Sequence, residues 1–185
     1  MQGDFDRRSP PRLLCLDLQR GPGSQTGGHS GGVTGRDSRV ARCQDLMAFA
    51  RTAGWPVLHS FRLVGPIQPL SVEGLEPMAS ETVLLRRGAS AFSHPRMAEL
   101  ASGSAASGLV ILALTLGAPC ITTALQAHEL GVEVQLVTDT LCPVDIRGVG
   151  SMTVREVLLG IASPFTGLTS TAELLGDRPV KAAND

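Results

Sequence analysis

The sequence predicts an α/β fold of three layers, in which a mainly parallel sheet of about five to six strands carries helices on both faces. Short apolar runs alternate along the chain with segments of helical periodicity, at the spacing of βαβ units. The run Leu109 to Leu114 is followed by a Gly/Pro break and a second helical pattern, as expected for a buried parallel strand that leads into a helix. The length of 185 residues suits a single domain (1–185).

Three strands and one helix are expected in the first half of the chain. Each strand is a compact apolar run of four to six residues, which is the usual length of a buried strand. The helix has apolar residues at helical spacing, Asp37 or Ser38 as its N-cap, and Gly54 at its stop. In order, these elements are the strand Leu13 to Leu18, the helix around Val40 to Ala50, the strand Pro56 to Phe61, a loop at 64–79 and the strand Thr82 to Leu85.

Two more strands and two more helices are expected in the second half. The first helix ends at Gly131, a residue type that commonly follows a helix. The second begins at a capping box formed by Thr153 and Glu156. In order, these elements are the strand Gly108 to Leu114, the helix Pro119 to Leu130, the strand Val132 to Thr138 and a helix with Val154, Val157, Leu158 and Ile161 on one face.

Three segments are expected to be flexible: the N-terminus 1–11, a glycine-rich loop at 20–36 and the tail 177–185. Residues 21–35 hold seven glycines, but neither GxxxxGK[ST] nor a clean GxGxxG, the patterns that cradle phosphates. We therefore expect no nucleotide cofactor, and no other cofactor, to bind there.

The composition argues against several classes of function. Sixteen basic and seventeen acidic residues give a net charge of -1, so neither a nucleic acid nor an anionic membrane is an expected partner. One Trp, five Phe and no Tyr offer few surfaces for base stacking. Because the only lysine is Lys181 in the tail, a reaction that needs a lysine in the folded core is excluded.

The cysteines predict a reducing compartment. The four are widely spaced and form no CxxC pair and no His/Cys metal pattern, so we expect reduced thiols, no metal and a cytoplasmic location. The N-terminus is polar and lacks the apolar region of a secretion signal. The cysteines are Cys15, Cys43, Cys120 and Cys142.

Polar residues mark three places where predicted strands end. In open parallel sheets, ligands bind at the carboxyl ends of the strands. Asp17, Arg86 with Arg87, and the turn from Thr115 to Cys120 occupy such ends. These are the candidate site residues.

Taken together, these segments resemble the isochorismatase-like, or cysteine hydrolase, family. Leu14 to Gln19 resembles the family's first strand, which ends in Asp-x-Gln, and Arg86 to Phe92 resembles its Lys-x-x-x-Ser-Ala-Phe segment. Thr123 to Asp139 resembles a helix and the fifth strand, and Phe165 to Leu175 the closing strand and turn. The resemblance covers nearly the whole chain.

This resemblance implies a small-molecule substrate or ligand and a homo-oligomer. It also implies that Gln19, Ser90, Phe92 and Thr115 bind substrate. The Asp-x-His pattern that accompanies the metal site of similar nicotinamidases is absent, so no metal is expected.

Similar proteins place an Asp, a Lys and a Cys at the ends of the first, third and fourth strands. The Asp handles protons, the Lys orients it, and the Cys attacks a carbonyl. Asp17 matches the first position. The second falls on Arg86, which keeps its proton but can pair with a carboxylate or an anionic substrate.

Two alignments of the turn place either Pro119 or Cys120 on the nucleophile position. We favour Pro119, because it keeps Ala124, Ala127 and Gly131 in register with the family's helix. Proline supplies neither a nucleophile nor a backbone N–H. Similar enzymes build an oxyanion hole from that N–H and one four residues earlier, and losing one donor costs roughly 100- to 1000-fold in rate.

Two functions remain open. In the first, Asp17 acts as an acid on a vinyl ether, as in the isochorismatases proper, which also lack the cysteine, while Arg86 holds a substrate carboxylate. In the second, the protein has lost its chemistry and serves in small-molecule binding or in assembly. A conventional cysteine amidase is not expected.

Overall fold

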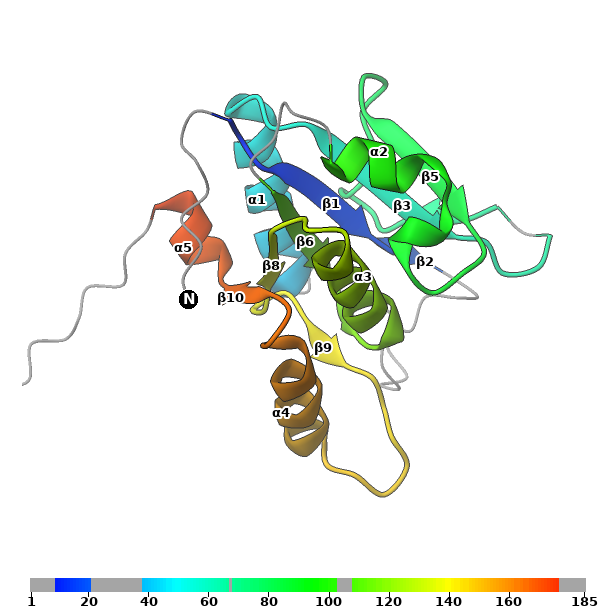
Figure 1. The fold of residues 1–185 in the computed structure, drawn as a ribbon, viewed down its shortest axis with the longest axis vertical. Coiled ribbons are helices and arrows are strands. Elements are labelled where there is room, and N and C mark those ends of the chain that lie inside the picture. The colour runs from blue at the N-terminus through cyan, green and yellow to red at the C-terminus, as the bar shows by residue number, and fades with distance from the viewer. Residues whose placement is uncertain (1–8, 21–37, 67, 103–107, 177–185) are drawn as a thin grey trace, which may run out of the picture.

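The computed structural model describes residues 9–20, 38–66, 68–102 and 108–176. Its centre is a six-stranded sheet in the order β10-β8-β6-β1-β3-β5, in which all neighbouring strands are parallel (Figure 1). These strands are β1 (Arg12–Leu16), β3 (Val57–Arg62), β5 (Thr82–Arg86), β6 (Leu109–Ala113), β8 (Val134–Val137) and β10 (Gly167–Thr169).

Two small strand pairs lie outside the main sheet. Strand β2 (Gln19–Arg20) pairs antiparallel with β4 (Leu70–Ser71), and β7 (Thr115–Leu116) pairs parallel with β9 (Cys142–Pro143). Both pairs follow the carboxyl ends of central strands, so they extend the region where a ligand site is expected.

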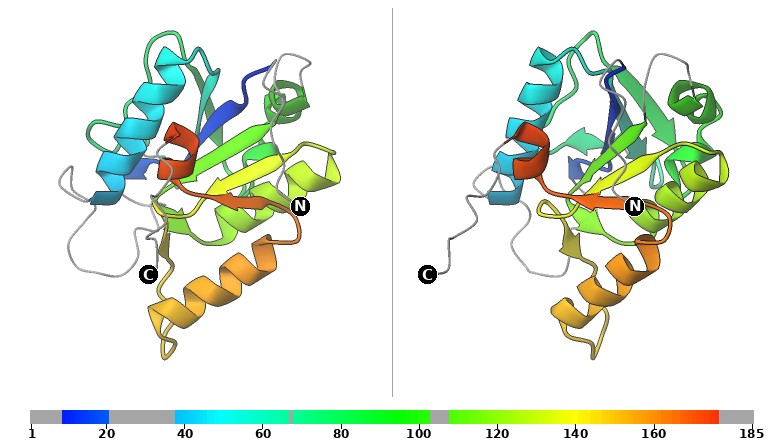
Figure 2. Two further views of the ribbon diagram at one scale, coloured as in Figure 1. Left: turned by 90° about the vertical axis from the view of Figure 1, so that its left-hand side faces the viewer. Right: turned by 60° about the vertical axis from the view of Figure 1, so that its left-hand side comes forward.

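Helices cover both faces of the sheet (Figure 2). Helices α1 and α5 lie on one face, and α2, α3 and α4 lie on the other. The helices are α1 (Ser38–Thr52), η1 (Ala91–Ser93), α2 (Arg96–Ser102), α3 (Ala118–Glu129), α4 (Ser151–Ala162) and α5 (Thr171–Leu175). This arrangement confirms the predicted three-layer fold.

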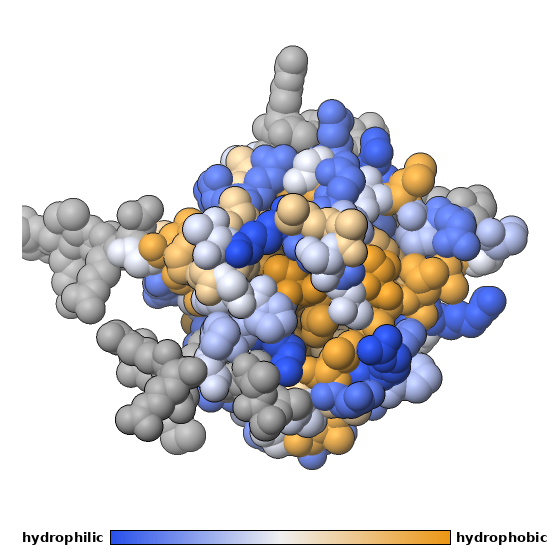
Figure 3. Space-filling view, turned by 90° about the horizontal axis from the view of Figure 1, so that it is seen from above, coloured by the Kyte–Doolittle hydropathy of each residue, from blue (hydrophilic) through white to orange (hydrophobic). Residues whose placement is uncertain are grey.

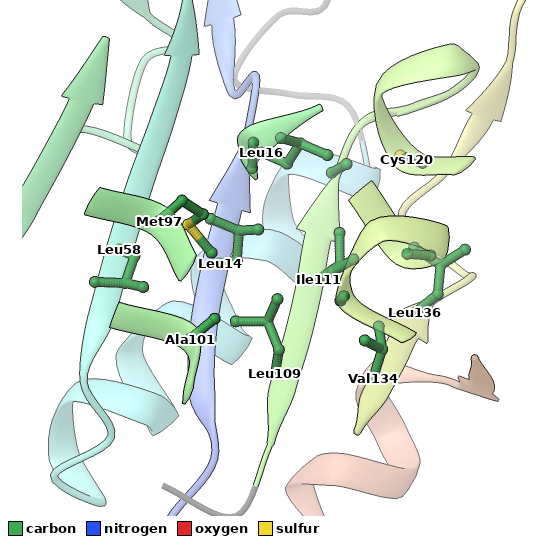
Figure 4. Packing of buried hydrophobic residues seen from close by; sticks show 14 of the residues in the cluster. Leu14, Leu16, Leu58, Met97, Ala101, Leu109, Ile111, Cys120, Val134 and Leu136 are labelled. Carbon is green, nitrogen blue, oxygen red and sulfur yellow. The ribbon is translucent and has the colours of Figure 1, made fainter. Parts of the chain in front are cut away.

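The apolar core is divided between the two faces because side chains alternate along a strand. On β1, Leu14 and Leu16 pack toward α2 and α3, while Leu13 and Cys15 pack toward α1. Figure 4 shows the first of these layers, with Leu14 and Ile111 between the sheet and the helices. The expected strands therefore form the centre of both cores.

The first strand ends earlier than the sequence predicts. Residue Asp17 has a φ of 52°, in the left-handed region, so the chain turns there and Leu18 leaves the strand. The other expected strands all form within two residues of their predicted bounds. Of the expected flexible segments, only residues 9–11 and 20 fall within the described part of the chain.

The expected capping box at Thr153 is wrong. Gly150 is the N-cap of α4, with no side-chain hydrogen bond to the cap. A capping box forms instead at α5, where the Ser170 hydroxyl accepts from the Glu173 amide and the Glu173 carboxylate accepts from the Ser170 amide. The carboxylate of Asp139 also accepts from the amide and hydroxyl of Thr171, which fixes the start of α5.

The face of α4 also differs from the prediction. Val154 is buried and Leu158 packs partly against the core, whereas Val157 and Ile161 are 54% and 49% exposed. The helix buries Val154 and Ala162 and half-buries Leu158, so the face toward the core differs from the predicted stripe.

A partly buried ion cluster joins α1, β3 and the segment that precedes β5. The Glu81 carboxylate accepts hydrogen bonds from Arg51 of α1 at 2.7 and 3.0 Å and from the Met78 amide at 2.8 Å. His59 of β3 lies 2.9 Å from the same carboxylate. Burial alone would raise the pKa of Glu81, but these hydrogen bonds outweigh it and lower the pKa to about 2.

None of the helices in the described ranges combines the length and the hydropathy that a membrane span requires.

Candidate functional site

The site begins with Asp17, which directly follows the central strand β1. Its amide donates to the Ser60 carbonyl at 2.9 Å, which continues the parallel pairing of β1 with β3 for one more residue. Among the described residues, Asp17 is the only non-glycine with a positive φ. Such conformations concentrate at functional sites. The side chain of Asp17 is 14% exposed.

Arg86, at the end of β5, binds both oxygens of the Asp17 carboxylate. The two bonds measure 2.7 Å from Nη1 and 2.9 Å from Nη2. The same guanidinium donates to the carbonyls of Ala89 and Ser90 at 3.0 and 3.1 Å. Four of its five N–H donors are therefore engaged, and its side chain is fully buried. Asp17 and Arg86 were predicted to share one edge of the sheet, and the structure brings them together.

The turn before α3 holds the third candidate position. Pro119 lies in the first turn of the helix, where its missing N–H disturbs no helical bond, and it is buried. The neighbouring Cys120 is 1% exposed, and its thiol donates to the Thr115 carbonyl at 3.1 Å. Burial raises the pKa of the Cys120 thiol to about 12. Cys120 is therefore a neutral thiol at physiological pH.

Cys120 nevertheless lies at the same end of the sheet as the ion pair. The charges of Asp17 and Arg86 both act on its thiol. Figure 4 shows Cys120 at the level of Leu16, the last residue of β1. The position of the thiol is compatible with the site, and its burial and protonation are not those of a reactive cysteine.

Of the four residues expected to bind substrate, two have side chains committed to the protein itself. Both amide atoms of Gln19 bind the backbone of Arg62, at 2.8 and 3.0 Å, and Gln19 is 1% exposed. The Ser90 hydroxyl accepts from the Phe92 amide and caps the short helix η1. The phenyl ring of Phe92 packs partly against the core, and Thr115 lies half-buried in β7.

Two residues close to the ion pair in the fold were not predicted from the sequence. The strand β3 runs one residue further than expected and places Arg62 opposite Arg86. The Thr123 hydroxyl of α3 accepts from the Ala91 amide at 3.0 Å, which fixes the segment whose carbonyls bind Arg86. The sequence signal that could have indicated Arg62 is its place directly after the apolar run Pro56 to Phe61. The Thr123 contact joins residues 32 positions apart, so the sequence gives no local signal for it.

Within the described ranges, no three His, Cys, Asp or Glu side chains gather in a way that could hold a metal ion. Asp17 is the carboxylate at the candidate site, and both of its oxygens bind Arg86. His59 binds Glu81 on the opposite face of the sheet.

Comparison with known proteins supports this view of the fold. The isochorismatase domain model matches residues 11–157 of the chain. An isochorismatase from Pseudomonas putida KT2440 has a similar structure, with 20% sequence identity, a TM-score of 0.77 and 93% of each chain covered. A cysteine hydrolase from Pseudomonas syringae pv. phaseolicola 1448A gives 18% identity and a TM-score of 0.75, with 95% of this chain and 97% of that chain covered.

A third similar structure is a ribonuclease from Caenorhabditis elegans, with 15% identity, a TM-score of 0.72, and 94% of this chain and 83% of that chain covered. No curated protein matches the chain. At such identities the solved structures establish the shared fold, and activity has to be argued from the site.

Proposed function

The chain belongs to the isochorismatase family, since the isochorismatase domain model matches most of its length, and on this premise we propose that it is a hydrolase-like protein acting on a small molecule through acid catalysis by Asp17, without a cysteine nucleophile. One observation carries the proposal. Asp17 holds a left-handed backbone conformation at the carboxyl end of the central strand, and its side chain is partly exposed there. The neighbouring Pro119 has no nucleophile, and Cys120 is a protonated, buried thiol.

The reaction that needs an acid and no nucleophile is the hydrolysis of a vinyl ether. Protonated Asp17 would give its proton to the terminal carbon of the C=C bond, which leaves a cation stabilised by the ether oxygen. Water adds to that cation and returns a proton to Asp17. The resulting hemiketal separates into a ketone and an alcohol, so one water is consumed and the carboxyl group is restored.

The two hydrogen bonds from Arg86 to Asp17 have to be partly broken in this reaction. A carboxyl group that carries a proton must give up one of the two bonds that the guanidinium now donates. Arginine keeps its own proton, so the proton on Asp17 has to come from solvent or substrate.

The closed ion pair favours a second candidate function, that of a small-molecule-binding or assembly protein without catalysis. Arg86 is fully buried and holds both oxygens of Asp17, as expected of a structural ion pair. A substrate carboxylate could bind Arg86 only by displacing bonds that already exist.

For either function we propose a cytoplasmic protein without a nucleic-acid or membrane partner. Its four cysteines are all free thiols, and three of them are buried, which suits a reducing compartment.

The deciding experiment measures hydrolysis of isochorismate beside a panel of small primary amides. It compares the native chain with Asp17→Asn and Cys120→Ala. We expect isochorismate to be turned over by the native chain and by Cys120→Ala, and not by Asp17→Asn. Loss of amide turnover in Cys120→Ala would instead establish a cysteine amidase. If every variant folds and nothing is hydrolysed, the non-catalytic function replaces the first proposal.

A further inference from the structure

We infer that Thr123 of α3 is a positioning residue, which fixes Arg86 at the site so that the guanidinium keeps its place when the Asp17 carboxyl group takes up a proton. This role rests on the site of the proposed function, but it concerns the placement of Arg86 and is tested without turnover of any substrate.

The guanidinium of Arg86 is held from two sides. Asp17 accepts hydrogen bonds from its Nη1 and Nη2 atoms. On the other side, the carbonyl of Ala89 accepts from Nη2 and the carbonyl of Ser90 accepts from Nε. The two carbonyl bonds do not depend on the charge of Asp17. They hold the guanidinium when the carboxyl group is protonated and gives up one of its bonds, provided that the carbonyls stay in place.

The carbonyl of Ser90 belongs to the same peptide unit as the N–H of Ala91. In a trans peptide these two groups lie in one plane and point in opposite directions. The Ala91 N–H donates to the Thr123 hydroxyl at 3.0 Å, and the Ser90 carbonyl accepts from Nε of Arg86 at 3.1 Å. Through this one rigid peptide, the hydroxyl of Thr123 sets the direction of the carbonyl that binds Arg86.

Burial makes this contact hard to replace. Thr123 and Ala91 are both fully buried, so loss of the hydroxyl would leave the Ala91 N–H as a buried donor without an acceptor. The support for the hydroxyl is rigid, because Thr123 lies inside α3 and its neighbours Ala124 and Ala127 are packed in the core.

The loop after β5 closes on the same carbonyl. The Ser93 hydroxyl and amide both donate to the Ser90 carbonyl, at 2.8 and 3.1 Å. Gly88 permits this tight closure, because a Cβ at residue 88 would lie 2.5 Å from the Cβ of Ser93. Arg86 therefore binds carbonyls whose positions are already fixed, as a preorganised site requires.

The test follows the Nε–H proton of Arg86 by NMR in the ¹⁵N-labelled chain. Its rate of exchange with water reports how often its hydrogen bond to Ser90 opens. Thr123→Val removes the hydroxyl at a similar shape, and we expect it to accelerate this exchange about tenfold or more. Thr123→Ser keeps the hydroxyl and should stay within about threefold of the native rate.

Two controls separate positioning from a general loss of stability. Thr122→Val makes the same substitution at the preceding residue of α3, whose hydroxyl donates to the Ala118 carbonyl of its own helix. It should leave the exchange of Arg86 within about twofold of the native rate. In the same spectra of Thr123→Val, the Nε–H of Arg51, which binds Glu81, should also change less than about twofold. An equal acceleration in Thr122→Val, or at Arg51, would overturn the positioning role.

The role is also overturned if Thr123→Val exchanges Arg86 like the native chain, or if Thr123→Ser exchanges it as fast as Thr123→Val. If Thr123→Val does not fold, Ser93→Ala decides, because it removes a bond to the Ser90 carbonyl at an exposed position. We expect it to accelerate the exchange of Arg86 about threefold or more, and an unchanged rate would contradict the inference. None of these outcomes depends on hydrolysis of isochorismate, so a failure of the proposed reaction is recognised separately.

Discussion

The side chains at positions 119 and 120 decide what chemistry the turn before α3 can perform. Pro119 suits the start of a helix, where a missing N–H does no harm. Cys120, one residue later, turns its thiol to the Thr115 carbonyl inside the core. On the alignment that we propose, with Pro119 at the nucleophile position, a covalent mechanism lacks both its nucleophile and an oxyanion donor.

Cys120 is therefore predicted to be almost unreactive in the native protein. Burial raises the pKa of its thiol to about 12, roughly three units above an ordinary cysteine, and only the thiolate reacts. Alkylation by iodoacetamide near neutral pH should be about 1000-fold slower than in the urea-unfolded chain. Mass spectrometry of the modified peptides measures this rate, with half-buried Cys142 as the internal control. Rapid modification of native Cys120 would restore it as a candidate nucleophile.

How far single residues could be assigned from the sequence depended on where their partners lie. Asp17 and Arg86 each end a strand, and parallel topology alone brings such ends to one edge. Gln19 was expected to bind substrate, but its partner is the backbone of Arg62, 43 residues away. No local pattern carries that information. The contact forms only when the chain after β1 folds against the end of β3.

Among the elements, the starts of the helices also depend on contacts that a local sequence pattern does not predict. The patterns Thr153-x-x-Glu156 and Ser170-x-x-Glu173 are equally good capping boxes in sequence, and only the second forms one. At α5 the box is supported by the carboxylate of Asp139, a residue just after the end of β8, which binds the first residue of the helix. At α4 the helix begins two residues before Thr153, so the hydroxyl is already inside the first turn.

The contact of α1 with β3 and with the start of β5 depends on Glu81, and we predict that Glu81→Gln destabilises the protein. Its folded pKa of about 2 lies below the ordinary value of 4.5, so the ionised form is favoured by folding. This stabilisation, about 3 kcal/mol, is complete above pH 4.5 and is lost as the pH falls from 4.5 toward 2. Burial lowers the pKa of neighbouring His59, which adds a loss of the same sign in acid.

Urea unfolding at pH 7 and at pH 3 measures this effect. Glu81→Gln should lose about 3 kcal/mol at pH 7 and clearly less at pH 3, where the native carboxylate is itself weakened. The matched control is Glu129→Gln, at an exposed position of α3, which should change the free energy of unfolding by less than about 0.5 kcal/mol. An equal loss for Glu81→Gln at both pH values would contradict the electrostatic explanation.

For the whole molecule, the sheet was predictable because its strands are short, apolar and separated by helices, which leaves few topologies. The outer surface was less predictable. Figure 3 shows a hydrophobic area bordered by hydrophilic residues on the face seen there. Exposed apolar side chains also occur on edge strand β5, at Val83 and Leu85, and on α4. The helical periodicity of α4 was correct, but not which of its apolar residues meet the core.

The expected homo-oligomer needs an apolar surface that a second copy can share, and we predict that α4 supplies it. Val157 and Ile161 lie one turn apart and are about half exposed. Between them, Gly160 has open space where a side chain would stand, so a second helix can approach closely. A twofold contact brings the same face together from both copies.

The double variant Val157→Glu and Ile161→Glu should therefore reduce the mass found by light scattering. The control variant Val83→Glu and Leu85→Glu adds equal charge on β5 and should not reduce that mass. A native chain that is already monomeric, or a loss of mass only in the β5 variant, would refute an interface at α4.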